Sequence, residues 1–188
     1  MPTIKRLTFA GNVALLYHDD GSIIRLIPSV DNQWIPTVGG GSDPPPTGDQ
    51  AALVAWMVAH IDAFAYSQGA GRLSPLTSGY TDCSGLTWFA YKTITGLEIG
   101  TWTGAQQNYG TVIQNGVAGQ SPTEANMVIG DLLFYSWSGP NSNYDHVDMY
   151  TGPNQVLGHG GPGSGPTYKT MNTRAAAAYE WRVRRYIV

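Results

Sequence analysis

The one cysteine of this 188-residue chain, Cys83, stands where a helix is expected to begin. Thr81 and Asp82 are residues of the helix-capping kind, and apolar residues at helical spacing follow as far as Gly96. In the first turn of a helix, a thiol faces unpaired backbone N–H groups and the positive end of the dipole, which favour the nucleophilic thiolate. The alternative is a packing residue, because free cysteines are among the most buried residues.

Two histidines downstream of the cysteine supply the second half of a thiol site. His146 and His159 lie in two short strand-like segments, 146–150 and 155–159, separated by Gly152, Pro153 and Asn154. A turn centred between Gly152 and Pro153 places His146 directly opposite His159, with Cβ atoms ~5 Å apart on one face of a sheet. A bulge of one residue would break this pairing.

A cysteine nucleophile needs a pair of polar side chains such as these two histidines. One histidine accepts the thiol proton and later protonates the leaving amine, and a second polar group orients that histidine. The backbone N–H of Cys83 would help to stabilise the oxyanion. Asp148 is a rival for the orienting role, because it shares a sheet face with His146 at ~7 Å.

Other interpretations of the histidines remain open. They could be surface polar residues, or they could form a three-ligand zinc site with Cys83. No CxxC or HExxH pattern supports the metal, so we expect no metal and no cofactor.

Composition excludes several classes of protein. The net charge is −3 and no basic run is longer than Arg184-Arg185, so no nucleic-acid partner is expected. The apolar stretch after Lys5 and Arg6 is interrupted at Gly11-Asn12, so we expect neither a signal peptide nor insertion into a membrane. A single cysteine allows no internal disulfide.

The chain is expected to have two parts joined by a linker. Residues 1–38 indicate β-structure, with a hairpin around 19–21 that must dock on the main domain or on a partner, because a lone hairpin is marginally stable. The Gly- and Pro-rich stretch 39–48 is typical of a linker. Residues 49–188 form the main domain.

Within the main domain, helices come first and strands follow. Apolar spacing predicts a helix over 49–67, with His60 at the edge of the core, and a second helix from Cys83. Residues 96–119 are interpreted as loop, and 122–127 as one helical turn. Strands are expected at 132–137, 146–150, 155–159 and 181–188. This order is an α+β pattern.

Three motifs in order resemble the NlpC/P60 family of cell-wall cysteine peptidases. They are the helix opening Asp82-Cys83-Ser84-Gly85-Leu86, then Gly130-Asp131-Leu132-Leu133-Phe134, then His146-Val147-Asp148-Met149-Tyr150 with Thr151-Gly152. The resemblance covers residues 50–188. It implies a papain-like α+β fold in which a cysteine-bearing helix packs on an antiparallel sheet, here with a short N-terminal β-hairpin appendage.

The resemblance also implies an activity and roles for residues. The expected activity is hydrolysis of peptidoglycan stem peptides, usually between D-γ-glutamyl and a diamino acid. Cys83 would be the nucleophile, His146 the base and His159 the orienting residue. The substrate would contact Tyr66 near the oxyanion, and Asp82 and Ser84 along the stem peptide. The position of Asp148 is commonly small in the family, so Asp148 is a departure that competes with His159.

Two further expectations concern context. The run Gly160–Pro166 resembles phage-encoded relatives, which suggests an endolysin released through a holin or a tail-associated lysin with residues 1–38 bound to tail proteins. The alternatives are a CHAP-type amidase or crossbridge endopeptidase, and a non-catalytic tail or wall-binding module. A lost cysteine or histidine would mark the last of these, and both Cys83 and His146 are present.

Overall fold

The chain folds into two compact units, Met1–Pro45 and Pro46–Val188. The computed structural model describes residues 4–10, 13–18, 23–28, 34–37, 48–140 and 144–187. The division between the units falls inside the stretch 39–48 that the sequence indicates as a linker, of which only Gly48 is among the described residues. The bounds 1–38, 39–48 and 49–188 stay predictions.

The first unit is an antiparallel sheet in the order β1-β2-β3-β4. Its strands are β1 (Ile4–Ala10), β2 (Val13–His18), β3 (Ile23–Pro28) and β4 (Trp34–Thr37). The predicted hairpin is the β2–β3 pair, in which Leu16 is opposite Ile24; its turn lies outside the described residues. The appendage is therefore larger than a hairpin, and the added strands on both sides relieve the marginal stability of two strands alone.

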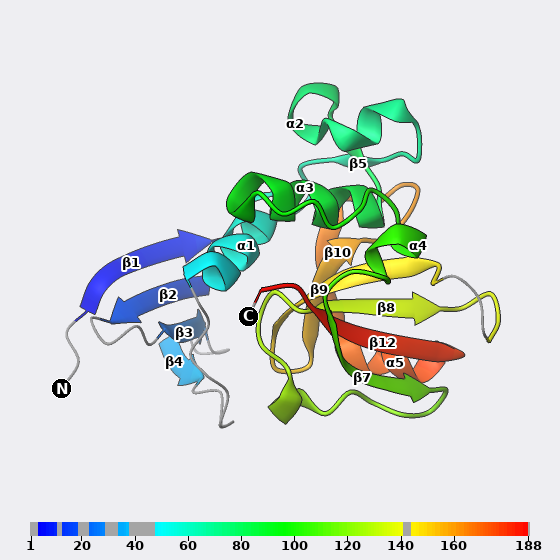
Figure 1. Ribbon diagram of the computed structural model, residues 1–188. Helices are drawn as coiled ribbons and strands as arrows, with labels where there is room; N and C mark the ends of the chain where they lie inside the picture. The colour runs from blue at the N-terminus through cyan, green and yellow to red at the C-terminus, as the bar shows by residue number, and fades with distance from the viewer. Residues whose placement is uncertain are drawn as a thin grey trace. The chain divides into compact units, whose positions relative to one another are not determined.

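The second unit contains a six-stranded antiparallel sheet in the order β11-β10-β9-β8-β12-β7 (Figure 1). Its elements are α1 (Gly48–Ala59), β5 (Ala65–Tyr66), η1 (Ala70–Leu73), α2 (Pro75–Ser78), β6 (Tyr80–Thr81), α3 (Cys83–Thr95), α4 (Thr103–Gln106), β7 (Thr111–Val117), η2 (Glu124–Asn126), β8 (Leu132–Ser136), β9 (His146–Gly152), β10 (Gln155–His159), β11 (Pro166–Thr170), α5 (Met171–Ala177) and β12 (Glu180–Arg185). The α+β, papain-like architecture expected from the sequence is confirmed.

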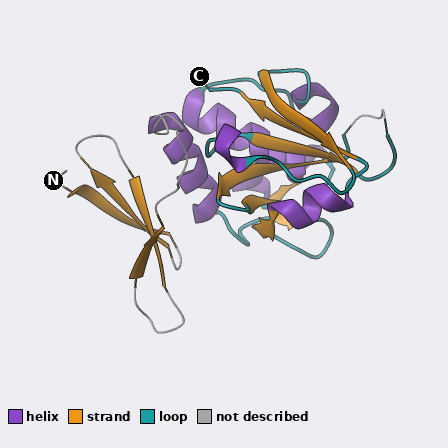
Figure 2. Ribbon diagram, turned by 90° about the horizontal axis from the view of Figure 1, so that it is seen from below, coloured by secondary structure: helices purple, strands orange, loops and turns teal. Residues whose placement is uncertain are grey.

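Helices cover both faces of this sheet, as Figure 2 shows for the second unit. Alternate residues of β8, β9 and β10, such as Phe134, Met149 and Leu157, pack against α1 and α3. The intervening residues, such as Tyr150 and Val156, pack in a second core with α5. Since neighbouring strand residues point to opposite faces, these two cores fix which side of the sheet every residue of β9 and β10 occupies.

The first helix and the segment 96–119 differ from the sequence prediction. Helix α1 ends at Ala59 and the chain turns at Asp62, which has φ 57°. Phe64 is buried in the core but outside the helix, so its apolar character made the predicted helix too long. The segment predicted as loop contains α4 and β7. The residues of β7 are mostly exposed or half-buried and so lack the alternation that marks a strand.

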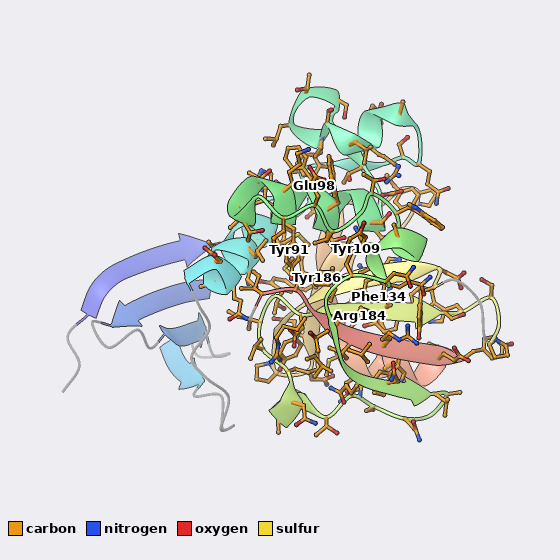
Figure 3. All side chains as sticks on the ribbon, in the orientation of Figure 1. Tyr91, Glu98, Tyr109, Phe134, Arg184 and Tyr186 are labelled. Atoms are coloured by element: carbon orange, nitrogen blue, oxygen red, sulfur yellow. The ribbon has the colours of Figure 1, made fainter. Side chains whose placement is uncertain are left out.

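Helix α3 is fixed to the sheet side of the unit by tyrosines. Tyr91 donates a hydrogen bond to the Gly130 carbonyl at 2.6 Å, and its ring lies 5.3 Å from that of Tyr186. Tyr186 in turn donates to the Gln106 carbonyl at 2.7 Å. Figure 3 labels both tyrosines between α3 and the sheet. These contacts help to hold α3 in place in the unit.

Candidate active site

Cys83 is the first residue of α3, as the capping pattern predicts. Asp82 has extended backbone and caps the helix: its Oδ1 accepts a hydrogen bond from the Gly85 N–H at 2.6 Å. An ideal Cβ on Gly85 would lie 2.9 Å from that same Oδ1, so only glycine leaves room for the cap. The thiol is 5% exposed and lies at the positive end of the helix.

The carboxylate of Asp82 has further partners. Arg72 Nη1 lies 3.1 Å from Asp82 Oδ1 and also donates to the Thr101 carbonyl at 2.7 Å. Ser84 Oγ donates to the same Oδ1 at 3.2 Å. Asp82 and Ser84, the predicted stem-peptide contacts, are 5% and 3% exposed, and the interactions that the structure shows for them stabilise the start of α3.

Tyr66 lies beside the cysteine although it is 17 residues away in the chain. Strand β5 pairs in parallel with β6, which puts Tyr66 next to Thr81. Burial, and then the charge of Cys83, raise the pKa of the Tyr66 phenol. The phenol of Tyr66 therefore stays protonated at neutral pH and is available as a hydrogen-bond donor near the thiol.

His146 begins β9 and interacts with two chemical partners. Its Nε2 lies 2.9 Å from Asp148 Oδ1, and its ring also interacts with the Cys83 side chain through hydrogen bonding and charge. A carboxylate only accepts hydrogen bonds, so Nε2 carries the proton in this contact and Nδ1 is the nitrogen left for the thiol. The ring packs 5.1 Å from Trp137.

The predicted opposition of His146 and His159 is wrong. In the β9–β10 pair, Tyr150 is opposite Val156 and Met149 is opposite Leu157, one residue away from the predicted register. The pairing shifts between Gln155 and Val156, which is the one-residue irregularity that would break the pairing. The two histidines therefore lie on opposite faces of the sheet.

His159 contacts the segment that carries Phe64 and Tyr66. Its Nε2 donates to the Phe64 carbonyl at 3.1 Å, and its ring meets Tyr66 edge-on with centroids 5.1 Å apart. Among the described residues its buried Nδ1 has no hydrogen-bond partner. Burial, opposed by the Phe64 carbonyl and reinforced by the Lys169 charge, lowers the pKa of His159, so the ring is neutral.

Asp148 lies two residues after His146 in β9, so its side chain is on the same sheet face, and it is fully buried. Lys169 Nζ donates to Oδ1 at 3.1 Å, and Arg174 Nε lies 2.7 Å from Oδ2. Burial alone would raise the pKa of this carboxyl, but His146, Lys169 and Arg174 outweigh burial and lower it well below the ordinary value. Asp148 is therefore an anion surrounded by cations.

The anion changes the charge state of His146. Burial by itself would lower the pKa of the imidazole, but Asp148, and then Cys83, raise it to about 9. A protonated imidazole next to a thiol stabilises a thiolate, which is the nucleophilic form. The arrangement can therefore exchange a proton between sulfur and nitrogen inside a buried site.

Three residues of this arrangement were missed by the sequence analysis. Lys169 and Arg174 lie in a segment with no motif, and nothing in their spacing indicates a shared carboxylate. Gly158 carries a signal, because an isolated glycine in a strand marks the close approach of another group. An ideal Cβ there would overlap Asp148 Oδ1 and lie 3.2 Å from Asp148 Cα.

The described residues also bear on metals and membranes. In those ranges no three His, Cys, Asp or Glu side chains are grouped so that they could share a metal ion. None of the helices that the structure describes has the length and apolar character needed to cross a bilayer.

Comparison with known proteins gives one consistent result. The sequence model of the NlpC/P60 family matches residues 64–185. Over 86 residues, 46% of this chain, the sequence is 38% identical to Protein P54 of Enterococcus faecium. That match spans only 14% of Protein P54.

Solved structures agree. The NlpC/P60 domain of the peptidoglycan hydrolase SagA is 28% identical with a TM-score of 0.50, covering 71% of this chain and 97% of that domain. A hypothetical invasion protein of Mycobacterium tuberculosis is 26% identical with a TM-score of 0.54, covering 80% and 70%. An NlpC/P60 family protein from Bacillus cereus is 18% identical with a TM-score of 0.59, covering 98% of this chain and 54% of that protein. This likeness supports the fold.

Proposed function

Since the chain belongs to the NlpC/P60 family, we propose that it hydrolyses peptide bonds in peptidoglycan stem peptides by a thiol mechanism. The observation that carries this proposal is the position of Cys83 at the capped start of α3, in contact with the buried imidazole of His146. The printed description of SagA as a peptidoglycan hydrolase supports the substrate class.

The reaction follows from the proton positions. The Cys83 thiol gives its proton to His146 Nδ1, and the sulfur attacks the carbonyl carbon of the scissile bond. His146 then gives that proton to the leaving nitrogen as the C–N bond breaks, which leaves a thioester. Water attacks the thioester while His146 accepts a proton from it, and the proton returns to the sulfur when the acid product leaves.

Two groups would stabilise the tetrahedral oxyanion. The backbone N–H of Cys83 lies at the start of a helix of ordinary length, where the dipole favours negative charge. The Tyr66 hydroxyl would be a second donor; the pairing of Tyr66 with Thr81, two residues before Cys83, supports this role. For the scissile bond we propose the D-γ-glutamyl–diamino acid link, with Asp82 and Ser84 contacting the stem peptide.

Product analysis tests the proposal. Purified peptidoglycan is digested with the wild type and with Cys83→Ala, and the muropeptides are identified by mass spectrometry. We expect new peptides with a free N-terminal diamino acid from the wild type and none from Cys83→Ala, which should stay folded because alanine is smaller than cysteine and favours the helix. Activity retained in Cys83→Ala would contradict the mechanism.

The same digest separates the alternatives. Intact stem peptides released from glycan would indicate an amidase of the CHAP type, and cleaved crossbridges would indicate a crossbridge endopeptidase. Binding to peptidoglycan with no new product from the wild type would indicate a non-catalytic wall-binding module.

For the biological setting we propose a phage lysin, either an endolysin released through a holin or a tail-associated enzyme. The separate β-sheet unit of residues 1–45 supports a role in attachment, for example to tail proteins. Mass spectrometry of purified virions distinguishes the two: a tail-associated enzyme is present in virions, whereas an endolysin is found only in the lysate.

A further inference from the structure

We propose that Asp148, placed over Gly158 and paired with Lys169 and Arg174, is the positioning residue that orients His146 and supports its imidazolium, while His159 serves the fold. This inference rests on the proposed thiol chemistry. The residue that orients the base would then come from β9, the same strand as the base itself.

The hydrogen bond to His146 is the first argument. Asp148 Oδ1 accepts from His146 Nε2 at 2.9 Å, and both side chains are nearly or fully buried. This contact fixes the ring in the tautomer whose Nδ1 is available to the Cys83 sulfur. In a site of low polarity, such a charge-assisted hydrogen bond is stronger than it would be in water.

The glycine on the neighbouring strand is the second argument. Continuing the β9–β10 register from Met149–Leu157 places Asp148 directly opposite Gly158. The carboxylate occupies the space in which a side chain at 158 would lie, as the overlap with an ideal Cβ shows. The third group of the site thus comes from β9, and the opposing position of β10 is left without a side chain.

The basic residues are the third argument. Lys169 Nζ also donates to the Gly158 carbonyl at 2.7 Å, so it contacts both residues of the opposed pair. Arg174 lies over the rings of Trp137 and Tyr135, with distances of 4.6 and 5.3 Å to the centroids. A carboxylate with a cation on each side keeps its ionised form and its orientation inside the protein.

The surroundings of His146 contain other polar groups, and none replaces Asp148. Cys83 approaches from α3 and Tyr135 faces the ring from β8, while Lys169 of β11 and Arg174 of α5 act through the carboxylate. Burial would raise the pKa of Asp145, the residue before His146, but hydrogen bonds from Ser138 and from the backbone N–H of Trp137, and then the His146 charge, lower it. Asp148 is the anion bonded to the ring.

His159 has the properties of a structural residue. It lies on the opposite sheet face, its Nε2 donates to the carbonyl of Phe64, and it is fully buried and neutral. Its hydrogen bond joins the end of β10 to the segment that carries Tyr66. We therefore expect the loss of His159 to lower the stability of the protein and to leave the pKa of His146 in place.

The test is the titration of His146 measured by NMR in the Cys83→Ala protein, which removes the contribution of the thiol and needs no peptidoglycan. Asp148→Asn is compared with His159→Gln. His60→Gln is the control, since the His60 ring donates to the Trp56 carbonyl and stacks on the rings of Trp56 and Phe64. We expect Asp148→Asn to move the His146 titration down towards its ordinary range, and the two glutamine variants to leave it in place.

Activity of the same substitutions in the Cys83 protein gives the second readout. Asp148→Asn should lower the rate by roughly 100-fold and shift its pH profile, whereas His159→Gln should lower it less than tenfold. A His146 titration that follows His159 and ignores Asp148 overturns the proposal. If Asp148→Asn fails to fold, the ¹⁵N chemical shifts of His146 in Cys83→Ala give the test. The proposal requires a proton on Nε2 and a His146 pKa above its ordinary value. A His146 pKa in the ordinary range overturns the assignment.

The NMR arm also separates this inference from the proposed function. If the wild type cleaves no peptidoglycan, the thiol mechanism fails while the titration still reports whether Asp148 controls His146. If the wild type is active and the titration ignores Asp148, only the assignment of the positioning residue fails.

Discussion

The two faces of the β9–β10 pair each bury a histidine, and the two rings have opposite charge behaviour. On one face His146 contacts an ionised carboxylate, and its pKa rises to about 9. On the other face His159 contacts a backbone carbonyl, and burial lowers its pKa. Both rings are almost fully buried, so burial does not explain the difference.

The comparison shows that the nearest partner decides the role of a buried histidine. A full negative charge outweighs the cost of burying an imidazolium, whereas a carbonyl dipole does not. The spacing of His146 and His159 along the chain predicted that both rings belong to one site. A shift of one residue in strand pairing moves one of them to the other face of the sheet.

The largest expected effect comes from removing one histidine at a time. His146→Ala should lower the rate of peptidoglycan hydrolysis by about 10² to 10⁴-fold, because the general base is lost. His159→Ala should cost less activity but about 2 kcal/mol of unfolding free energy, through the lost hydrogen bond and the cavity. Initial rates and urea unfolding measure the two quantities. An equal loss of activity in both variants would mean that the faces do not differ in function.

A smaller effect is expected at the glycine opposite Asp148. Gly158→Ala places a methyl group where the carboxylate lies and should displace it, lowering the rate by about tenfold or more. Gly48→Ala is the matched control, because nothing lies within 4 Å of its added Cβ. A crystal structure or the His146 NMR titration reports the displacement. Wild-type rates in Gly158→Ala would show that the close approach is not needed.

The smallest effect is on stability as a function of pH. The pKa of His146 in the folded state is raised above the unfolded value of 6.5. The contribution of His146 to the free energy of unfolding is therefore complete below pH 6.5 and is lost as pH rises through about 9. The pKa of Asp148 is lowered, so the same pair loses stability as pH falls below about 4. Urea unfolding of Cys83→Ala should show a loss on the order of 2 kcal/mol between pH 6 and 9.5, absent in Asp148→Asn. A flat profile in both would contradict the ion pair.

Local signals predicted the parts of the site that depend on local structure. Asp82 before Cys83 is a helix cap by residue type, and the structure shows that cap. The strands on both sides of Gly152 follow from their apolar and β-branched residues, and the structure contains them. The α+β class follows from the order of helices and strands.

The register and the buried cations depend on features that a pattern does not contain. Pro153 and Asn154 occupy the turn, Asn154 with φ 51°, so the turn is centred one residue later than predicted. The shift next to Val156 then leaves a register one residue from the prediction. Lys169 and Arg174 reach Asp148 through tertiary packing of β11 and α5, which no spacing in the sequence indicates.

The place of β12 in the sheet has a consequence for when the candidate site can form during synthesis. Val183 pairs with Leu133 of β8 on one side and with Gln114 of β7 on the other, so β12 fills a gap between strands made much earlier in the chain. Contacts between such distant segments form late in folding. Strand β8, which pairs with β9 on one side, therefore lacks its other neighbour until residue 185 has been synthesised. We expect a ribosome-bound chain that lacks β12 to show none of the proposed peptidoglycan hydrolysis, because the sheet that carries His146 is incomplete without that strand.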